Sequence, residues 1–258
     1  QNKEKYMKLR EYQNNIAIQA ADKLTAFGCC YLSMECRTGK TLTALFAADK
    51  FNAKSVLFIT KLKAIPSVKS DYIALQPSFK LEVVNFESSH KVTGIFDLVI
   101  IDEAHSLGAY PKPSKRTLSI KALCTGLPVL FLSGTPSPES YSQLYHQFWV
   151  CSKSPWKSYK SFYKWAKEYV YTRQKKVNGS LINDYSCANK PKIDNDTKNL
   201  FISYSQEQAG FEVNINEHIL QVQMKNRTGE YIRRLQNDLI VDVNGYTCLL
   251  YTSPSPRD

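Results

Sequence analysis

The sequence predicts an α/β domain built on a doubly wound parallel sheet. Short runs of Val, Ile, Leu and Phe recur along the first half of the chain without polar alternation, as in strands buried on both faces. Stretches with helical spacing separate these runs, and strand, helix, strand alternation implies right-handed crossovers between parallel strands. With 258 residues and 43% hydrophobic content, the chain is long enough to bury a core.

The elements of this domain follow in order from the N-terminus. Apolar residues three or four positions apart, such as Leu9, Tyr12 and Ile16, predict an amphipathic helix over 6–27 that ends at Gly28. Buried strands are expected at 29–34, 55–60, 81–86, 96–101 and 128–133. Further helices are expected at 40–51, 65–75 and 114–124, after the first, second and fourth of these strands.

A basic, aromatic segment follows Pro138. Between residues 151 and 192 there are ten Lys or Arg residues against two acids, with Trp, Tyr and Phe interleaved. We expect a helical appendage in which the aromatic side chains pack onto the domain and the lysines contact phosphate. The net charge of +11 also predicts attraction to a polyanion, although charge alone does not separate nucleic acid from a membrane surface.

The lack of a recognisable targeting signal and the spacing of the cysteines favour an intracellular protein. No run approaches 18 uninterrupted apolar residues, and residues 1–5 lack the apolar stretch of a signal peptide, so we expect a soluble cytoplasmic protein without membrane contact. The seven cysteines include no Cys-x-x-Cys pair and have no histidines at ligand spacing, which favours buried reduced thiols.

A second domain is expected to begin near residue 201. Strand-like patterning over 217–224 and a helical pattern over 230–238 indicate it. The last eleven residues, 248–258, have no hydrophobic period and resemble the in-frame translation of a sequencing-library adapter, so we expect the natural chain to continue beyond about residue 247. The expected organisation is 1–150 for the first domain, 151–200 for the basic aromatic insertion, 201–247 for the truncated second domain and 248–258 for the adapter-like end.

A candidate phosphate-binding loop lies between the first strand and the helix that follows it. Gly39 lets the backbone approach a phosphate, Lys40 neutralises phosphate charge, and the Thr41 hydroxyl ligates Mg²⁺, while the amides of the helix start point at the anion. The full pattern has a glycine five positions before Gly39, where this chain has Met34. A Gly-Lys-Thr at an ordinary helix start is therefore the alternative.

An acidic pair follows the fourth predicted strand. The hydrophobic run 97–101 delivers Asp102 and Glu103 to the carboxyl end of a parallel strand, where such sheets bind ligands. Asp102 would hold Mg²⁺ through water, and Glu103 would orient or deprotonate an attacking water. The alternative is a solvated strand end with an incidental acid pair, and the phosphate loop upstream argues against it.

In this order, these motifs resemble those of the superfamily 2 helicases and translocases, the DEAD/DEAH-type motors. Residues 34–41 resemble motif I, 99–105 resemble motif II, and 133–136 resemble motif III. The segment 9–13 is similar to the adenine-sensing entry helix of the Swi/Snf-related branch, including its phage and bacterial members. The resemblance covers about residues 6–240 and implies a RecA-like P-loop NTPase domain.

The resemblance also implies roles for individual residues. They are Gln13, Thr38, Gly39, Lys40 and Thr41 for ATP; Thr41 and Asp102 for Mg²⁺; Lys40, Asp102 and Glu103 for catalysis; His105, Ser133 and Thr135 for coupling the nucleotide state to the track; and Lys61 and Lys63 for nucleic-acid phosphates. Residues 85–87 occupy another strand end where this class contacts nucleic acid. For Lys61, Lys63 and 85–87, the alternative is that they are ordinary polar residues of the surface. Many relatives have glycine at the position of Arg37, and we assign Arg37 no role.

The resemblance implies an ATP-dependent helicase or translocase, with DNA as the expected track. The alternatives are the motor subunit of a restriction system and a nucleic-acid-binding module with an inert nucleotide site. Motors of this superfamily place ATP between two RecA-like domains, and the second supplies arginine fingers. None of its motifs is recognisable before residue 247, so we expect residues 1–247 to bind Mg-ATP, to hydrolyse it slowly and not to translocate.

Overall fold

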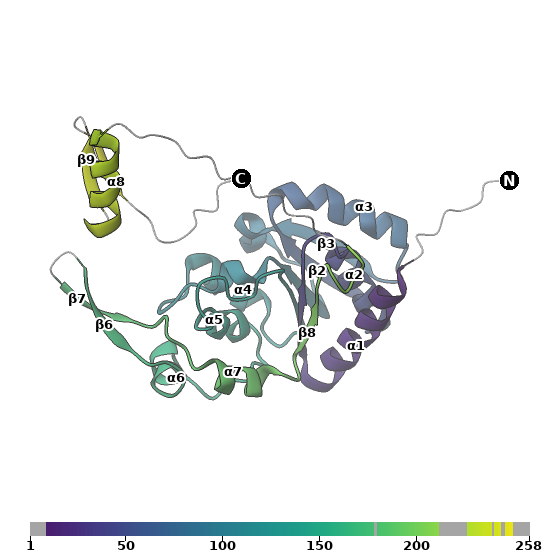
Figure 1. Cartoon of the computed structure of the whole chain (residues 1–258). Helices are drawn as coiled ribbons and strands as arrows, with labels where there is room; N and C mark the ends of the chain where they lie inside the picture. Colours follow the sequence, from purple (N-terminus) through teal and green to yellow (C-terminus); the bar gives the residue numbers. More distant parts are fainter. Residues whose placement is uncertain (1–8, 178–179, 212–225, 239, 244–245, 250–258) are drawn as a thin grey trace. The chain divides into compact units, whose positions relative to one another are not determined.

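A parallel β-sheet organises the first of the two units into which the chain divides, Gln1–Glu212 and Val213–Asp258. The computed structural model describes residues 9–177, 180–211, 226–238, 240–243 and 246–249. In the first unit, helices lie on both faces of the sheet (Figure 1). The predicted α/β class with a parallel sheet is confirmed.

The sheet has six strands in the order β3-β2-β4-β5-β1-β8. They are β1 (Cys29–Met34), β2 (Ser55–Thr60), β3 (Lys80–Asn85), β4 (Leu98–Asp102), β5 (Val129–Leu132) and β8 (Phe201–Tyr204). Every neighbouring pair in it is parallel. Strand β5 lies between β1 and β4, so the carboxyl ends of these three strands meet at one edge of the sheet.

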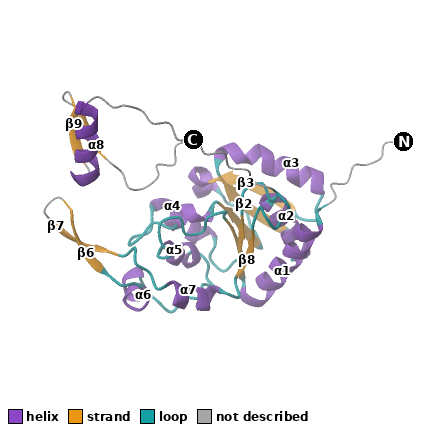
Figure 2. Ribbon diagram, viewed as in Figure 1, coloured by secondary structure: helices purple, strands orange, loops and turns teal. Residues whose placement is uncertain are grey.

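Two layers of helices cover the sheet (Figure 2). One face packs against α1 (Glu11–Phe27), α2 (Lys40–Lys50) and α3 (Ile65–Leu75). The other packs against α4 (Lys115–Leu123), α5 (Gln143–Trp149), α6 (Phe162–Tyr169) and α7 (Lys190–Thr197). Short 3-10 helices follow three strand ends: η1 (Leu62–Ala64), η2 (Phe86–Lys91) and η3 (Ala104–Leu107).

Alternate residues of each central strand enter the two hydrophobic layers. In β1, Cys29 and Tyr31 lie in the layer of α4 to α7, whereas Cys30 and Leu32 lie in the layer of α1 to α3. All four are fully buried. A strand with two buried faces needs an unbroken apolar sequence, which is why these strands were recognisable without alternation.

The first helix is shorter than the sequence predicts. The expected range was 6–27, but Arg10 has an extended backbone and α1 begins at Glu11. Residues 6–8 lie outside the described residues. The helix ends at Gly28 as expected, because Gly28 adopts a left-handed conformation with φ 68° and donates its amide to Leu24 O.

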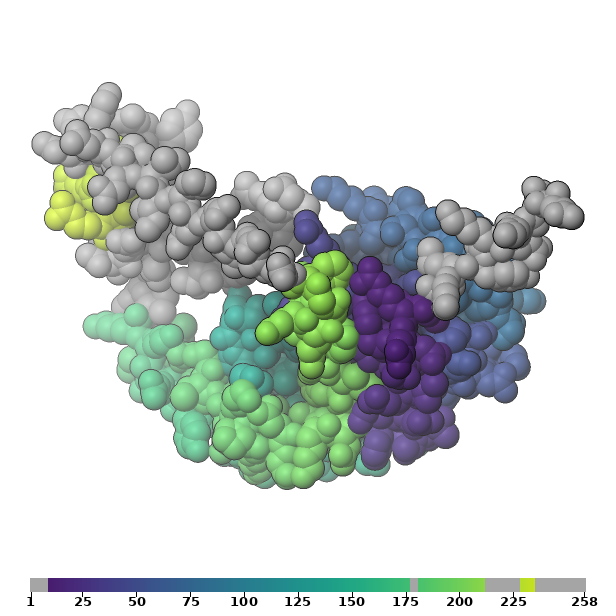
Figure 3. All heavy atoms as spheres, turned by 45° about the vertical axis from the view of Figure 1, so that its right-hand side comes forward, coloured from purple at the N-terminus to yellow at the C-terminus, as the bar shows by residue number. Residues whose placement is uncertain are grey.

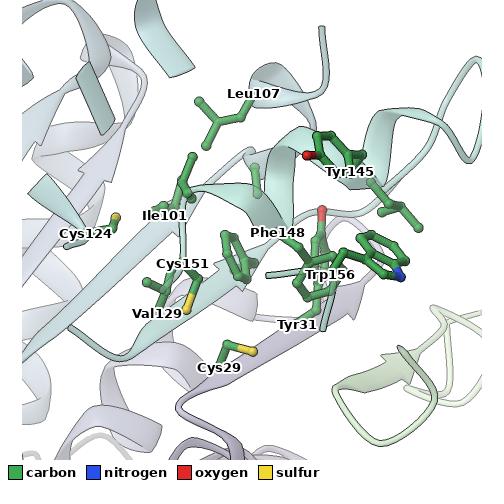
Figure 4. Close-up of a cluster of buried hydrophobic side chains, with 14 of the residues drawn as sticks. Cys29, Tyr31, Ile101, Leu107, Cys124, Val129, Tyr145, Phe148, Cys151 and Trp156 are labelled. Carbon is green, nitrogen blue, oxygen red and sulfur yellow. The ribbon is translucent and has the colours of Figure 1, made fainter. Parts of the chain in front are cut away.

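Most aromatic side chains of the basic segment pack onto the first unit, as predicted. Trp156, Phe162 and Trp165 are each at most 2% exposed. Figure 4 shows Trp156 beside Phe148, which in turn lies beside Tyr31 of β1. The ring centroids of Phe148 and Trp156 are 5.6 Å apart. This segment therefore belongs to the core of the first unit.

The segment 151–200 is not purely helical. Strands β6 (Arg173–Val177) and β7 (Ser180–Asp184) pair in an antiparallel hairpin between α6 and α7. The expectation of a helical appendage is therefore correct for α6 and α7 and wrong for the hairpin. Lys175 Nζ lies 2.6 Å from Asp184 Oδ2 across the hairpin.

Residues 201–204 do not begin a second domain. They form β8, which pairs in parallel with β1 in the register Tyr31↔Phe201 to Met34↔Tyr204. The chain after β8 also lies against α1 (Figure 3). Tyr204 stacks on Tyr12 with ring centroids 4.5 Å apart, and Arg10 lies over the ring of Phe211 at 5.5 Å. The first unit thus extends to Glu212.

The second unit contains a helix and a hairpin. Helix α8 (Asn226–Asp238) includes the predicted 230–238, and β9 (Ile240–Val243) pairs antiparallel with β10 (Tyr246–Leu249). Strand β10 includes residues 248 and 249, the first two of the adapter-like segment. The predicted strand at 217–224 and residues 250–258 lie outside the described residues.

The structure shows free thiols at Cys29, Cys30, Cys36, Cys124, Cys151 and Cys187. Four are buried as predicted: Cys29, Cys30, Cys124 and Cys151. Cys36, however, is exposed. A search of the described helices for a membrane span found none of sufficient length and apolarity.

Candidate nucleotide site

The loop that joins β1 to α2 is a tight turn held by its own backbone. Thr38 is fully buried, and its Oγ1 donates to Glu35 O at 2.7 Å. Arg37 and Gly39 have positive φ values of 65° and 76°. These left-handed residues turn the chain from the end of β1 into the first turn of α2.

Only glycine fits at position 39. A Cβ there would lie 2.2 Å from Gln13 Nε2, and the φ of 76° is a conformation that L side chains rarely adopt. The Gln13 side chain bridges two backbones: Oε1 accepts from Arg10 N at 3.0 Å and Nε2 donates to Gly39 O at 3.4 Å. Tyr12 Oη donates to Thr38 O at 2.9 Å. The start of α1 therefore contacts the loop through Tyr12 and Gln13. The expected contact of Gln13 with adenine stays a prediction.

Lys40 and Thr41 occupy the first turn of α2, and both are half-buried. The first internal hydrogen bond of the helix runs from Thr43 N to Gly39 O at 3.0 Å. Among the described residues, no side chain caps this end of the helix. The amides of the first turn and the Lys40 ammonium thus form a terminus suited to an anion.

Asp102 ends β4 and is 8% exposed. Thr60, at the end of the adjacent strand β2, donates its Oγ1 to Asp102 Oδ2 at 2.8 Å. Burial raises the pKa of the Asp102 carboxyl, while the Thr60 hydrogen bond and the charge of Lys40 act in the opposite direction. Sequence analysis did not predict this role of Thr60. The signal that could have indicated it is a polar residue at the end of an otherwise apolar strand.

Replacing Asp102 with asparagine should stabilise the protein in the absence of metal and nucleotide. An Asp whose folded pKa is raised loses stability as pH rises through its unfolded and then its folded pKa. We expect a gain of about 1 kcal/mol at pH 7.5, or about 2–4 °C in Tm. The gain should shrink as pH falls toward the ordinary Asp pKa of about 3.9 and vanish below it, where Asp102 is protonated in both states. Equal Tm values for the two proteins from pH 4 to pH 8 would contradict this prediction.

Glu103 has a left-handed backbone with φ 53° and ψ 44°. This conformation costs roughly 1–2 kcal/mol for a residue other than glycine. Its carboxylate contacts two neighbours: Oε1 lies 3.7 Å from Lys61 Nζ, and Oε2 lies 3.3 Å from His105 Nδ1. The strained turn directs the Glu103 side chain to the edge of the sheet where the phosphate loop also lies.

His105 links the acidic motif to the end of β5. Its Nδ1 lies 2.9 Å from Ser133 Oγ, and Ser133 Oγ also accepts from Thr135 N at 3.1 Å. Burial lowers the pKa of His105. A Cβ on Gly134 would lie 3.4 Å from Met34 O, so the turn after β5 also approaches the phosphate loop.

Some of these residues, Lys40, Glu103 and His105 among them, line one pocket of about 440 Å³. It is lined by Glu35, Cys36, Lys40, Glu103, His105, Gly134, Thr135 and Gln206. Gln206, which follows β8, was missed by sequence analysis. Its backbone amide donates to Glu35 Oε2 at 2.7 Å, and its Nε2 donates to Cys36 O at 2.8 Å. Gln206 therefore fixes the outer side of the loop between β1 and α2.

The two lysines predicted to contact nucleic acid lie beyond this pocket lining. Lys61 follows β2, and its side chain is 54% exposed while it pairs with Glu103. Lys63 is exposed on η1. Residues 85–87, the other strand end where nucleic acid was expected, follow β3. Asn85 caps η2 by accepting from Ser88 N at 3.2 Å, and Glu87 pairs with Arg116 at 2.9 Å.

Of the predicted nucleotide, metal and coupling residues, the pocket lining includes Lys40, Glu103, His105 and Thr135. It does not include Gln13, Thr38, Gly39, Thr41, Asp102 or Ser133. A scan of protein-family models and a search of curated proteins each found no match to this chain.

Proposed function

We propose that this chain is the ATP-binding part of a nucleic-acid-dependent motor of the superfamily 2 helicase and translocase type. One observation carries the proposal: Lys40 at the start of α2, Glu103 and His105 after β4, and Thr135 after β5 line a single pocket at the carboxyl edge of the parallel sheet. Ligands bind at this edge in open α/β sheets. A helix start with an incidental lysine would not explain why an acidic pair and a histidine join it.

The side chains present fit Mg²⁺ accompanied by phosphate oxygens. Thr41 supplies a hydroxyl and Asp102 a buried carboxylate, and Mg²⁺ typically uses one or two carboxylates with substrate phosphates and water. Among the described residues, no group of three or more His, Cys, Asp or Glu side chains forms a separate metal cluster. When bound, the ion would neutralise charge on the phosphate oxygens.

The residues of the pocket divide the hydrolysis reaction among them. Lys40 and the amides of the α2 terminus bind the outer phosphates and stabilise the charge that develops on them. Glu103 orients a water molecule and accepts its proton as the new P–O bond forms and the bond to the ADP oxygen breaks. Burial raises the pKa of Asp102 even with the charge of Lys40 nearby, so a bound cation would favour the ionised carboxylate.

The His105–Ser133 contact supports a role in coupling. Ser133 and Thr135 share a hydrogen bond on the turn after β5, and Gly134 of the same turn approaches Met34 O beside the phosphate loop. A shift of the loop or of Glu103 would therefore be transmitted to this turn. The track is nucleic acid, with DNA proposed, because the net charge of +11 favours a polyanion and Lys61 and Lys63 are exposed beyond the pocket.

Titration of the whole chain with a fluorescent ATP analogue tests the proposal. We expect saturable binding with Mg²⁺ present and a large loss of affinity after chelation, because Asp102 and Thr41 contribute only through the metal. Mg-ATP at 100 times its Kd should also stabilise the fold by about 2.7 kcal/mol. Absence of saturable binding, in a protein that still binds nucleic acid, would leave the inert binding module as the function and defeat the motor proposal.

A further inference from the structure

A second pocket, outside the nucleotide site, has aromatic walls. Its volume is about 180 Å³. It is lined by Pro111, Lys112, Pro113, Tyr145, His146, Trp149, Lys160, Ser161, Phe162 and Tyr163. Drug-sized ligands occupy pockets of roughly 300–1,000 Å³, so this one suits a single flat ring system.

The walls of this aromatic pocket are held rigidly by their packing. Phe162 is 2% exposed and stacks on His146, with ring centroids 5.7 Å apart and an interplanar angle of 20°. His146 Nδ1 lies 2.7 Å from Ala109 O, and burial lowers the pKa of His146 to about 4. A neutral His146 therefore adds an uncharged ring to the wall at neutral pH.

The rim of the aromatic pocket is positively charged and partly open. Lys112 and Lys160 are exposed on it, and Tyr163 is 44% exposed although its neighbours in the wall are buried. The lining residues include no Asp or Glu. Two ammonium groups around an aromatic cavity match a flat base attached to phosphates, because bases stack on aromatic rings while lysines contact the backbone.

We propose that the aromatic pocket receives one unstacked base of a single-stranded nucleic acid, with the adjoining phosphates on Lys112 and Lys160. This inference rests on the nucleic-acid partner of the proposed function and adds the class of strand. A base in a duplex is paired and stacked, and extracting it costs free energy that a single strand does not require. A cationic peptide partner is disfavoured because the lining residues include two lysines and no carboxylate.

Helix α5 connects this pocket to the turn after β5. His146 lines the aromatic pocket, and the next residue, Gln147, donates its Nε2 to Pro136 O at 2.7 Å. Pro136 closes the Ser133–Pro136 turn that contacts His105. A base in the pocket would therefore contact a helix that also holds the coupling turn.

The test uses oligothymidylates that carry one fluorescent 2-aminopurine, whose emission falls on stacking. We expect Tyr163→Ala to weaken single-strand binding about 5- to 150-fold and to remove the quenching. Tyr163→Phe, which keeps the ring, should restore both. Tyr171→Ala is the matched control, because Tyr171 is 62% exposed and does not line the pocket.

The lysines give an independent measurement. Replacing Lys112 and Lys160 together with alanine should reduce the slope of log K against log salt by about 1.4, since each single-strand phosphate contact contributes about 0.7. Lys157 and Lys167, exposed lysines of the same segment outside the pocket lining, provide the control pair. An abasic oligomer of equal length should bind wild type as weakly as it binds Tyr163→Ala.

Two results would overturn the inference. One is equal binding of base-bearing and abasic oligomers by wild type, and the other is unchanged single-strand affinity in Tyr163→Ala. Parallel titration with the fluorescent ATP analogue separates this failure from that of the proposed function. If Mg-ATP binding persists while Tyr163→Ala has no effect, the aromatic pocket has no role in base binding and the nucleotide site stands.

Discussion

Lys40→Ala should remove most of the affinity of this chain for Mg-ATP. Lys40 lies in the first turn of α2 and lines the pocket that also receives Glu103 and His105. In the proposed function, its ammonium is the cation that binds the phosphates. Loss of a charged hydrogen-bonding partner costs about 1.5–3 kcal/mol, equivalent to a roughly 10- to 150-fold higher Kd. Titration with the fluorescent ATP analogue at constant Mg²⁺ measures this change.

The fold itself should tolerate the substitution. Lysine and alanine are both strong helix formers, and Lys40 is only half-buried at the helix start. Lys50→Ala is the matched control, since Lys50 occupies the last turn of the same helix and lies over the Phe46 ring at 4.8 Å. Equal Mg-ATP affinity in wild type and Lys40→Ala would remove Lys40 from the site and, with it, the main support for a P-loop.

The sequence predicted the central sheet closely because its strands are buried on both faces. The expected ranges 29–34, 55–60 and 65–75 coincide with β1, β2 and α3. Strands β1 and β2 are largely apolar, and Gly28 marks the end of the preceding helix through its left-handed backbone. An apolar run and a glycine at the end of a helix are local features of the chain. They can therefore be recognised in a single sequence.

The misplaced elements depend on contacts between residues far apart in the chain. Strand β8 has only four residues, and its partner β1 lies about 170 positions earlier, so nothing local assigned it to the first sheet. The hairpin of β6 and β7 has polar strands without apolar alternation. The dipeptide Asn178-Gly179 between them was the available turn signal.

The same distinction applies to the candidate site. Residues at the ends of parallel strands were predicted together because the carboxyl ends share an edge. Gln206 could not be predicted, since its hydrogen bonds to Glu35 and Cys36 follow from the position of β8. Tyr163 was hidden among aromatic neighbours, and only the exposed fraction of each side chain separates Tyr163 from the buried Phe162 and Trp165.

Glu103→Gln should separate binding from hydrolysis. Glutamine keeps the size of the side chain and its contacts at the strained turn, but it cannot accept a proton from water. Mg-ATP binding should therefore be retained, while phosphate release in a single turnover falls by about 10²- to 10⁴-fold, the usual contribution of a general base. Stability should change little, because the lost pairing with Lys61 involves an exposed side chain and such pairs contribute about 0–1 kcal/mol.

The control for Glu103→Gln is Glu82→Gln, an exposed carboxylate on the edge strand β3. Loss of binding together with hydrolysis would make Glu103 a binding residue, and an unchanged rate would exclude it as the base. The outcome also bears on coupling, because Glu103 Oε2 and Ser133 Oγ share the same His105 nitrogen. With the carboxylate replaced by an amide, His105 Nδ1 keeps Ser133 and loses its charged partner. The turn at Ser133–Pro136 should then respond less to the nucleotide even though the nucleotide still binds.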